Sequence, residues 1–288
     1  MISELSELAA VSRRLGANAG YVQGGGGNTS IKIDGGDVMY IKASGIDLAT
    51  ISAETGFLPL NSARLKSEIG ACKSEADYSA LMAACLLRER MVDDCGNHLP
   101  SIESGFHALL GRCVLHSHSV WANLLTCAQG GRALLAKALP DALWVDYCTP
   151  GLTLTLAIAE RIQDTKASVI FLQNHGLIVS AETPDAAYAL HSAVNQRVRG
   201  LFASVPTFPR PTQDAFQDEG LLFPDQAVYQ CNPALAASLA GQQTAQAYAY
   251  LLGTIPELGL TLNFINDAEK AVLLNMESEK HRQKVAQA

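Results

Sequence analysis

The chain has 288 residues, which is enough for one large domain with an extension or for two smaller domains. Apolar residues make up 48% of the sequence and charged residues 17%, which excludes the polar excess typical of disordered chains. The formal net charge is -7 and the lysines and arginines are scattered, so the basic surface of a nucleic-acid or anionic-membrane binder is excluded as well. Small molecules and other protein subunits remain as partners.

The sequence also indicates the cellular compartment. It does not start with a basic segment followed by an apolar run, and no apolar stretch reaches the roughly 20 residues that span a bilayer. The seven cysteines are widely spaced and contain no Cys-x-x-Cys pair. We therefore expect a cytoplasmic protein whose cysteines are reduced and mostly buried, without a disulfide framework or a cysteine zinc site.

Helical and strand-like segments alternate along the first 205 residues. The expected helices, in chain order, are residues 3–15, 75–90, 103–110, 119–137, 151–163 and 184–203. The expected strands are residues 29–33, 38–41, 112–117, 144–145, 168–172 and 176–179. The turn DGGD at residues 34–37 is a strong hairpin signal between the first two strands. This mixture of hairpins and helices predicts an α/β sandwich around a largely antiparallel sheet.

A change of composition marks the end of this region. Three prolines within residues 206–211 rule out a continuing helix, so we place a domain boundary there, with a main domain at residues 1–205 and a helical extension at 206–288. We expect the extension to pack on the main domain or on a subunit interface. Within it, the pattern predicts a short strand at 225–230 and a helix at 233–251.

The last predicted helix has a clear start signal. Asn266 is expected to cap its first turn, and Glu269 is expected to reach back in a capping-box arrangement. Ala271 and Leu274 are expected on its buried face.

The sharpest chemical signal is HSH at residues 116–118, in a predicted strand. Side chains two residues apart on a strand face the same way, so His116 and His118 can grip one ion. A catalytic zinc ion usually takes three protein ligands and leaves one position open. His175, at a turn between two apolar strands, and Glu103, in a short helix before the histidine strand, are the further candidates. Glu103 is expected to ligate the ion or to act as a base.

Each histidine taken alone is more simply explained as a hydrogen-bonded, partly buried side chain. The four residues together favour a metal site. We expect His107 to pack in its helix or to support a ligand from behind.

Five motifs in order give a family resemblance. They are a glycine-rich loop ending in NTS at residues 24–30, ASG at 43–45, PSIE at 100–103, HSH at 116–118 and NHG at 174–176. Over roughly residues 5–203 the chain resembles the class II aldolase/adducin family. The tail, with LFPD at 222–225 and LLNMESEKHR at 273–282, resembles the extension of longer rhamnulose-phosphate-aldolase-like relatives.

The resemblance implies a three-layer αβα sandwich and a homotetramer with its sites at subunit interfaces. It also implies zinc, or another divalent metal such as Mn²⁺ or Co²⁺, bound by His116, His118 and His175. Glu103 matches the acid/base glutamate of the family, which can also ligate the empty site. Such lyases cleave a carbon-carbon bond of a ketose phosphate or sugar-acid phosphate through an enediolate, using the metal as a Lewis acid.

The resemblance further implies a phosphate site built from three loops. The matching positions are Asn28, Thr29, Ser44, Gly45 and Ser101. Lys42, and Lys32 with it, lies on a strand nearby, and one of the two is expected to contribute charge to the anion.

Two departures from the family pattern leave alternatives open. Ile102 stands where a second serine is common, and residues 119–146 contain no tyrosine to serve as proton donor. The sequence therefore favours an aldolase but leaves open a 3-oxo sugar-acid phosphate decarboxylase, an epimerase or a dehydratase. A non-catalytic, adducin-like interaction module is the alternative from another class, and the retained metal residues argue against it.

Overall fold

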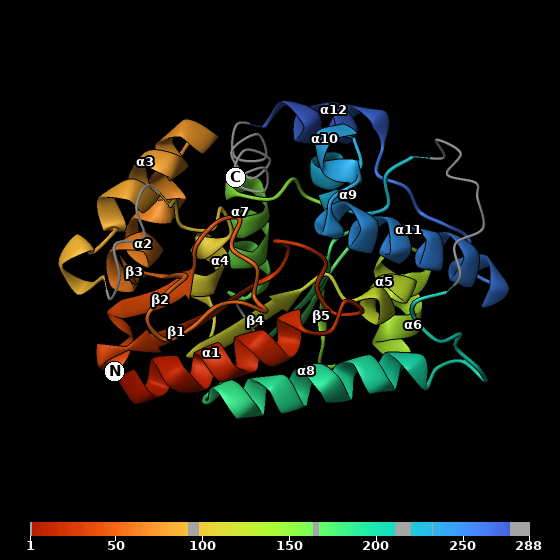
Figure 1. The fold of residues 1–288 in the computed structure, drawn as a ribbon, viewed down its shortest axis with the longest axis horizontal. Coiled ribbons are helices and arrows are strands. Elements are labelled where there is room, and N and C mark those ends of the chain that lie inside the picture. Colours follow the sequence, from red (N-terminus) through yellow and green to blue (C-terminus); the bar gives the residue numbers. More distant parts are fainter. Residues whose placement is uncertain (1, 92–97, 164–166, 211–219, 232, 277–288) are drawn as a thin grey trace.

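A seven-stranded sheet lies at the centre of the protein (Figure 1). The computed structural model describes residues 2–91, 98–163, 167–210, 220–231 and 233–276. The strands are β1 (Asn28–Ile33), β2 (Val38–Lys42), β3 (Phe57–Asn61), β4 (Cys113–Ser117), β5 (Leu143–Val145), β6 (Val169–Leu172) and β7 (Gly176–Ala181). Their order in the sheet is β3-β2-β1-β4-β7-β6-β5. The β5–β6 pair is parallel and the other neighbours are antiparallel, which confirms the expected largely antiparallel sheet.

Helices cover both faces of this sheet. Those of the first part are α1 (Ile2–Gly16), α2 (Ser62–Glu68), α3 (Glu75–Cys85), α4 (Ser104–Leu109), α5 (Val120–Thr126), α6 (Gly131–Ala138), α7 (Leu152–Arg161) and α8 (Pro184–Arg199). The later helices are α9 (Asp225–Tyr229), α10 (Pro233–Ala236), α11 (Leu239–Glu257) and α12 (Asp267–Asn275). In Figure 1, α1 and α8 lie along one face, while α4 and α7 lie against the other. The result is the expected three-layer αβα sandwich.

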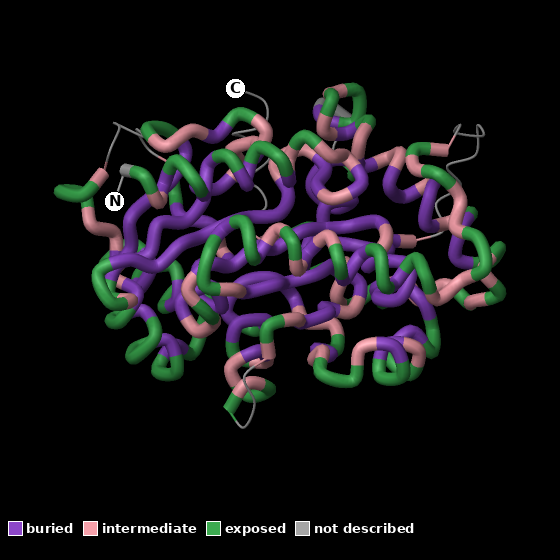
Figure 2. The backbone as a smooth tube through the Cα atoms, turned by 90° about the horizontal axis from the view of Figure 1, so that it is seen from below, coloured by how far each residue is buried: buried purple, intermediate pink, exposed green. Residues whose placement is uncertain are grey.

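Strand alternation in β4 separates two hydrophobic cores. Cys113 and Leu115 belong to the core under α1 and α8, whereas Val114 belongs to the core with Phe106 of α4 and Ile158 of α7. All five β4 residues are buried, and Figure 2 shows the central strands buried along their length. Burial of a side chain of this size contributes about 1.5–3 kcal/mol, so the register of β4 is strongly specified. His116, two residues after Val114, therefore faces α4 and α7.

The segment after residue 206 shares a core with α5. Leu222, Phe223, Tyr248 and Leu251 pack in one cluster with Leu124 of α5. Figure 1 shows α11 beside α5 at one end of the sheet. Residues 277–288, which include part of the tail resemblance, lie outside the described residues.

Two predictions for the second half of the chain need correction. Residues 225–230 do not form a strand, because Asp225–Tyr229 is helix α9, and its Gln226 side chain accepts hydrogen bonds from the backbone N–H groups of Leu222 and Phe223 just before the helix. The buried residue of α12 is Leu273, while Leu274 is 41% exposed, so the predicted face was wrong.

The capping of α12 was predicted correctly only in part. Asn266 does cap the helix, since its side chain accepts from the N–H of Glu269. The Glu269 carboxylate, however, accepts a hydrogen bond from Thr149 at 2.7 Å. The sequence analysis also missed β3 and α2.

Among the described helices, none combines the length and apolar content that a bilayer crossing requires.

Asn174 connects the sheet to the extension. It sits in the turn between β6 and β7 with φ +52, and its side-chain amide donates to the backbone carbonyls of Leu222 at 2.9 Å and Asn263 at 2.6 Å. Its Oδ1 accepts from the Asn263 side chain at 2.8 Å. A buried side chain that makes three hydrogen bonds across this seam holds the two parts of the chain together.

We predict that Asn174→Ala lowers the free energy of unfolding by about 2–4 kcal/mol, because it leaves two carbonyls without their donor. Urea unfolding measures the change. Asn275→Ala is the matched control, since the side chain of that exposed asparagine, within the described residues, donates to Ala271 of its own helix, and its loss should change stability by less than about 0.5 kcal/mol. A loss in Asn174→Ala no larger than in the control would show that the turn does not anchor the extension.

Candidate metal centre

The end of β4 brings two histidines together on the face that carries α4. His116 lies on the strand, and His118 follows immediately after Ser117, the last strand residue. Their Nε2 atoms are 3.1 Å apart, and both rings are buried. The alternation of the strand therefore points both imidazoles at one place, as the sequence analysis predicted.

A third imidazole comes from the β6–β7 turn. The ring centroid of His175 lies 4.9 Å from that of His116 and 5.0 Å from that of His118. Gly176 allows this approach, since a Cβ there would lie 2.1 Å from the Ser117 carbonyl oxygen. One ligand atom from each histidine lies within 4.8 Å of the others, which is the arrangement of a three-histidine metal site.

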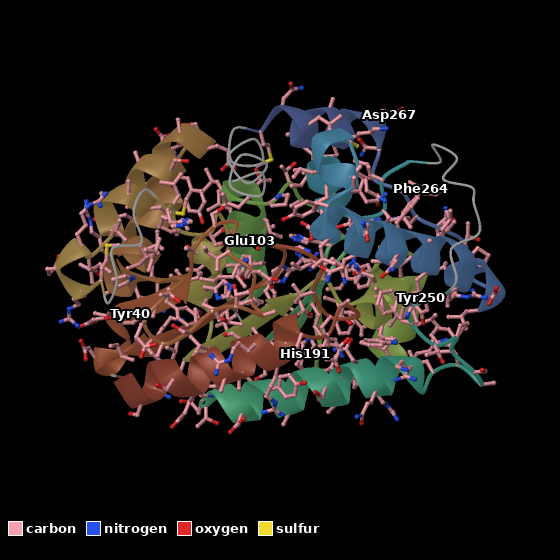
Figure 3. The ribbon with its side chains drawn as sticks, in the orientation of Figure 1. Tyr40, Glu103, His191, Tyr250, Phe264 and Asp267 are labelled. Atoms are coloured by element: carbon pink, nitrogen blue, oxygen red, sulfur yellow. The ribbon has the colours of Figure 1, made fainter. Side chains whose placement is uncertain are left out.

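Glu103 completes this arrangement from the start of α4, where it occupies the N-cap position. Its Oε2 lies 3.5 Å from Nε2 of His116, and its Oε1 lies 3.4 Å from Nε2 of His175. Figure 3 shows Glu103 near the centre of the molecule. The four predicted metal residues thus meet at one point, although they come from three separate parts of the sequence.

Burial sets the protonation states of this cluster. It lowers the pKa of His116 to about 4 and that of His175 well below its usual value, so both rings are neutral near pH 7. For Glu103, burial alone would raise the pKa, but the neighbouring histidines and the Asn28 amide lower it to about 2. His116 and His175 are therefore neutral and Glu103 is ionised, which are the forms that bind a cation.

Two of the three histidine rings are held by a hydrogen bond at Nδ1, the ring nitrogen that faces away from the cluster. The Nδ1–H of His116 donates to the carbonyl of Leu177 at 3.1 Å, and the Nδ1–H of His118 donates to the carboxylate of Asp225 at 2.5 Å. Each contact leaves Nε2 as the atom that carries the lone pair toward the centre. Such outer contacts orient the ligands of metal sites and set their tautomer.

Asn28 positions Glu103. Its Nδ2 donates to Glu103 Oε2 at 2.6 Å and to Ser101 Oγ at 3.2 Å, and its Oδ1 accepts from Nε2–H of His107. The other ring nitrogen of His107 bonds to Ser30 at 2.7 Å. His107, which we expected to pack in its helix or to support a ligand, supports the site through Asn28. Asn28 therefore positions Glu103 in addition to the phosphate contact predicted for it.

The predicted anion-binding loops border a small pocket in front of the cluster. Its walls include five of the predicted phosphate-site residues, namely Asn28, Lys42, Ser44, Gly45 and Ser101. Thr29 is not brought into this pocket, because on a strand its side chain faces the opposite way and contacts Ser12 Oγ at 2.7 Å.

The two lysines noted in the sequence, Lys42 and Lys32, donate hydrogen bonds to backbone carbonyl groups. Lys42 Nζ donates to the carbonyls of Gly25 and Ile46, each at 2.7 Å, and so ties the glycine-rich loop to the ASG loop. Lys32 lies away from the pocket and donates to carbonyls at the end of α4, including Gly111 at 2.7 Å and Leu110 at 2.9 Å. Lys32 therefore stabilises the helix that carries Glu103.

Sequence reasoning missed Asp225, Pro224 and Pro150, which also line the pocket. Asp225 is 107 residues from its partner His118, so no local spacing relates the two. The LFPD motif that contains it was noticed as part of the extension, but nothing in the sequence connected it to the metal site.

Comparisons with known proteins identify the family of the chain. The family model described as "Class II Aldolase and Adducin N-terminal domain" matches residues 6–200. The chain belongs to the class II aldolase and adducin family. A match of this extent covers all the predicted site residues, whereas Asp225 and the rest of the extension lie beyond it.

Individual relatives share the fold of the family domain. The chain is 30% identical over 197 residues to the uncharacterized oxidoreductase YuxG of Bacillus subtilis, covering 64% of this chain but 27% of that protein. The N-terminal class II aldolase domain of a conserved protein from Thermoplasma acidophilum matches with TM-score 0.60 and 26% identity, over 68% of this chain and 92% of that one. An aldolase II superfamily protein from Pseudomonas syringae matches with TM-score 0.50 and 13% identity, over 99% of this chain and 90% of that one.

The residues present fit a divalent cation. Within the described part of the chain, Glu103 Oε1 and His175 Nδ1 are buried without a hydrogen-bond partner, and such atoms are costly to leave unpaired. Ligation of Glu103 would remove one of these deficits. Three imidazoles and one carboxylate form a donor set suited to zinc, with cobalt and manganese as substitutes.

We predict that His116→Ala lowers the zinc content from about one ion per chain to less than about a tenth of that value. The variant keeps two of the three imidazole ligands, which is too few to retain the ion. Elemental analysis after desalting measures the content. His98→Ala removes a histidine outside the cluster and should keep its metal. Equal metal contents in the two variants would contradict the ligand assignment.

We also predict that the metal-free protein loses stability in mild acid. The folded-state pKa is about 4 for His116 and about 3 for His191, both below the usual value, so the unfolded chain binds more protons between about pH 6.5 and pH 4. Stability is thus greatest above pH 6.5 and falls as the pH falls, by about 2 kcal/mol per histidine between pH 7 and pH 5. Urea unfolding of chelator-treated protein measures this slope. It should be shallower in His191→Gln, and a pH-independent free energy of unfolding would refute the prediction.

Proposed function

We propose that the protein is a divalent-metal lyase, an aldolase that cleaves a carbon-carbon bond of a ketose phosphate or a sugar-acid phosphate. The observation that carries the proposal is the convergence of three buried imidazoles and an ionised, incompletely paired Glu103 at the floor of a pocket. A structural zinc site is closed by four protein ligands, which commonly include cysteine. The ligand cluster of the described residues contains no cysteine, and it opens to a pocket.

A bound divalent cation would supply Lewis acidity toward a substrate carbonyl and its neighbouring hydroxyl. The chain's own residues do the remaining work. Glu103 takes up and returns the proton of the substrate, because its carboxylate faces the pocket and is held from one side by Asn28. Burial by the surrounding walls excludes water and strengthens the electrostatic interactions inside the pocket.

The far wall of the pocket suits an anion. Ser44, Gly45 and Ser101 present hydroxyl and backbone groups, and Lys42 holds two loops there from behind. We assign the phosphate of the substrate to this wall, as the resemblance in the sequence implies. A sugar-phosphate aldolase from Thermotoga maritima has the same fold at TM-score 0.50 and 15% identity, over 69% of this chain and 93% of that one.

The proposal includes the expected cytoplasmic location and a homotetramer with its sites at subunit interfaces. The location is supported by the six described cysteines, which carry free thiols as in a reducing compartment. We also propose the division into a main domain at residues 1–205 and an extension at 206–288, because α8 ends at Arg199 and the next described helix begins at Asp225.

One observation favours a second candidate reaction. The described residues that line the pocket include no tyrosine, although the carbanion formed by aldol cleavage needs a proton donor. Decarboxylation of a 3-oxo sugar-acid phosphate, epimerisation and dehydration use the same metal and the same base. An adducin-like interaction module has no use for the buried cluster, and so it is the weaker reading.

We predict that Glu103→Gln retains about one zinc ion per chain but lowers kcat at least about a hundredfold, because the amide cannot accept a proton. Purified protein would be assayed for product from a panel of ketose phosphates and 3-oxo sugar-acid phosphates, which also distinguishes cleavage from decarboxylation.

Glu75→Gln is the control for loss of a carboxylate charge away from the pocket. Glu75 accepts from the N–H of Leu152 at 2.9 Å outside the pocket, and an amide oxygen can still accept that bond. Turnover should be retained. An active Glu103→Gln enzyme would remove the acid/base role, and wild-type protein that neither holds nor acquires metal would overturn the lyase proposal.

A further inference from the structure

The extension contacts the histidine cluster and, separately, the glycine-rich loop beside it. Asp225 bonds to His118, Tyr229 Oη accepts from the N–H of Gly25 at 3.0 Å, and the carbonyls of Leu222 and Asn263 hold Asn174 beside His175. Gln243 of α11 also accepts from the N–H of Gly24 at 2.8 Å. Figure 1 shows α9 and α11 together on the side of the sheet from which these contacts are made.

The glycine-rich loop is shaped to admit this contact. A Cβ at Gly24 would lie 2.5 Å from the Cβ of Ala240, and a Cβ at Gly25 would lie 2.9 Å from Tyr229 Oη. At Gly26 a Cβ would lie 2.4 Å from Asp225 Oδ2 and 2.9 Å from His118 Nδ1. Three successive glycines therefore leave room for α9 and α11, and the third lies directly against the Asp225–His118 pair.

Asp225 is placed to act on His118. It is completely buried, and it has no access to solvent that would allow a surface role. Its Oδ2 lies 2.5 Å from His118 Nδ1, on the side of the ring opposite the cluster, while Nε2 of the same ring faces His116 at 3.1 Å. A carboxylate behind a ligating imidazole fixes its tautomer, holds the ring plane and makes the ligand nitrogen more basic.

We propose that Asp225 is a positioning residue of the metal centre, supplied by the extension, which holds His118 with its Nε2 lone pair toward the ion. The inference rests on the proposed metal-dependent function. It gives the extension a task in the site in addition to packing on α5. The task is chemical, because it depends on the carboxylate and not only on the helix that carries it.

The test measures zinc affinity by competition with a chelating dye for the wild type, Asp225→Asn, Asp225→Ala and Tyr229→Phe. Removal of such a carboxylate typically weakens metal binding about tenfold to a hundredfold. We expect that loss for Asp225→Ala and a smaller one for Asp225→Asn, whose amide oxygen can still accept the Nδ1–H bond. Tyr229→Phe removes a contact of the same helix without touching His118, so its zinc affinity should stay within about twofold of wild type.

A second measurement does not depend on metal. In ¹⁵N-histidine-labelled, metal-free protein, with His118 assigned by its loss in His118→Gln, the ring should be a single Nδ1–H tautomer. In Asp225→Ala it should become a mixture of both tautomers. Far-UV circular dichroism and the thermal midpoint establish that each variant is folded, and Asp225→Asn serves where the alanine variant is not.

The outcomes separate this inference from the function on which it rests. Wild-type protein that binds zinc, with unchanged affinity in both Asp225 variants or an equal loss in Tyr229→Phe, would overturn the positioning role and leave the lyase proposal intact. Wild-type protein that binds no zinc would overturn the lyase proposal. In that case the tautomer measurement still decides whether Asp225 holds His118, and an unchanged tautomer in the folded variant counts against it.

Discussion

An ionised carboxylate buried beside three imidazoles is the constraint around which this molecule is arranged. Removing such a charge from water costs several kcal/mol unless it finds partners, and Glu103 has a hydrogen bond to only one of its two oxygens within the described chain. The surroundings keep it in place. Asn28 holds it from β1, His107 holds Asn28, and Lys32 secures the end of the helix that begins beside it. The contacts of Asn28 with Glu103 and with His107 are buried, so the incompletely paired charge is confined to one point that faces the pocket. A cation bound at that point would pair it.

The sheet supplies the precision that this arrangement needs. His116 belongs to a strand with neighbours on both sides, paired with Asn28 of β1 and with Ile178 of β7. A shift by one residue would turn His116 toward α8 and send Ser117 into the site, which the two separate hydrophobic cores prevent. On the opposite face of the sheet, Ser117 forms a hydrogen bond with His191 at 2.7 Å. This bond explains the position of His191 without a catalytic role. The same strand thus carries chemistry on one face and support on the other.

Much of this could be predicted from sequence because the relevant signals are local. Alternation placed His116 and His118 on one side, and the NHG turn between two apolar runs placed His175 near them. The contacts that decide how the site works are not local. Asp225 meets His118 across 107 residues, and its segment was predicted as a strand because short apolar runs do not separate strand from helix. Thr29 adjoins Asn28 in the motif but faces away from it. A motif records which residues occur together and does not record which way each of them points.

The run of glycines at residues 24–26 couples two properties of the protein that would otherwise be independent. Glycine has the largest backbone entropy in the unfolded or detached state, so this loop is expensive to order by itself. The extension orders it through Tyr229 and Gln243, and the ordered loop forms one wall of the pocket. By thermodynamic linkage, any ligand that requires the ordered loop strengthens the docking of the extension by the same free energy that the docked extension adds to ligand binding. Binding in the pocket and docking of the extension are therefore linked through the order of one loop.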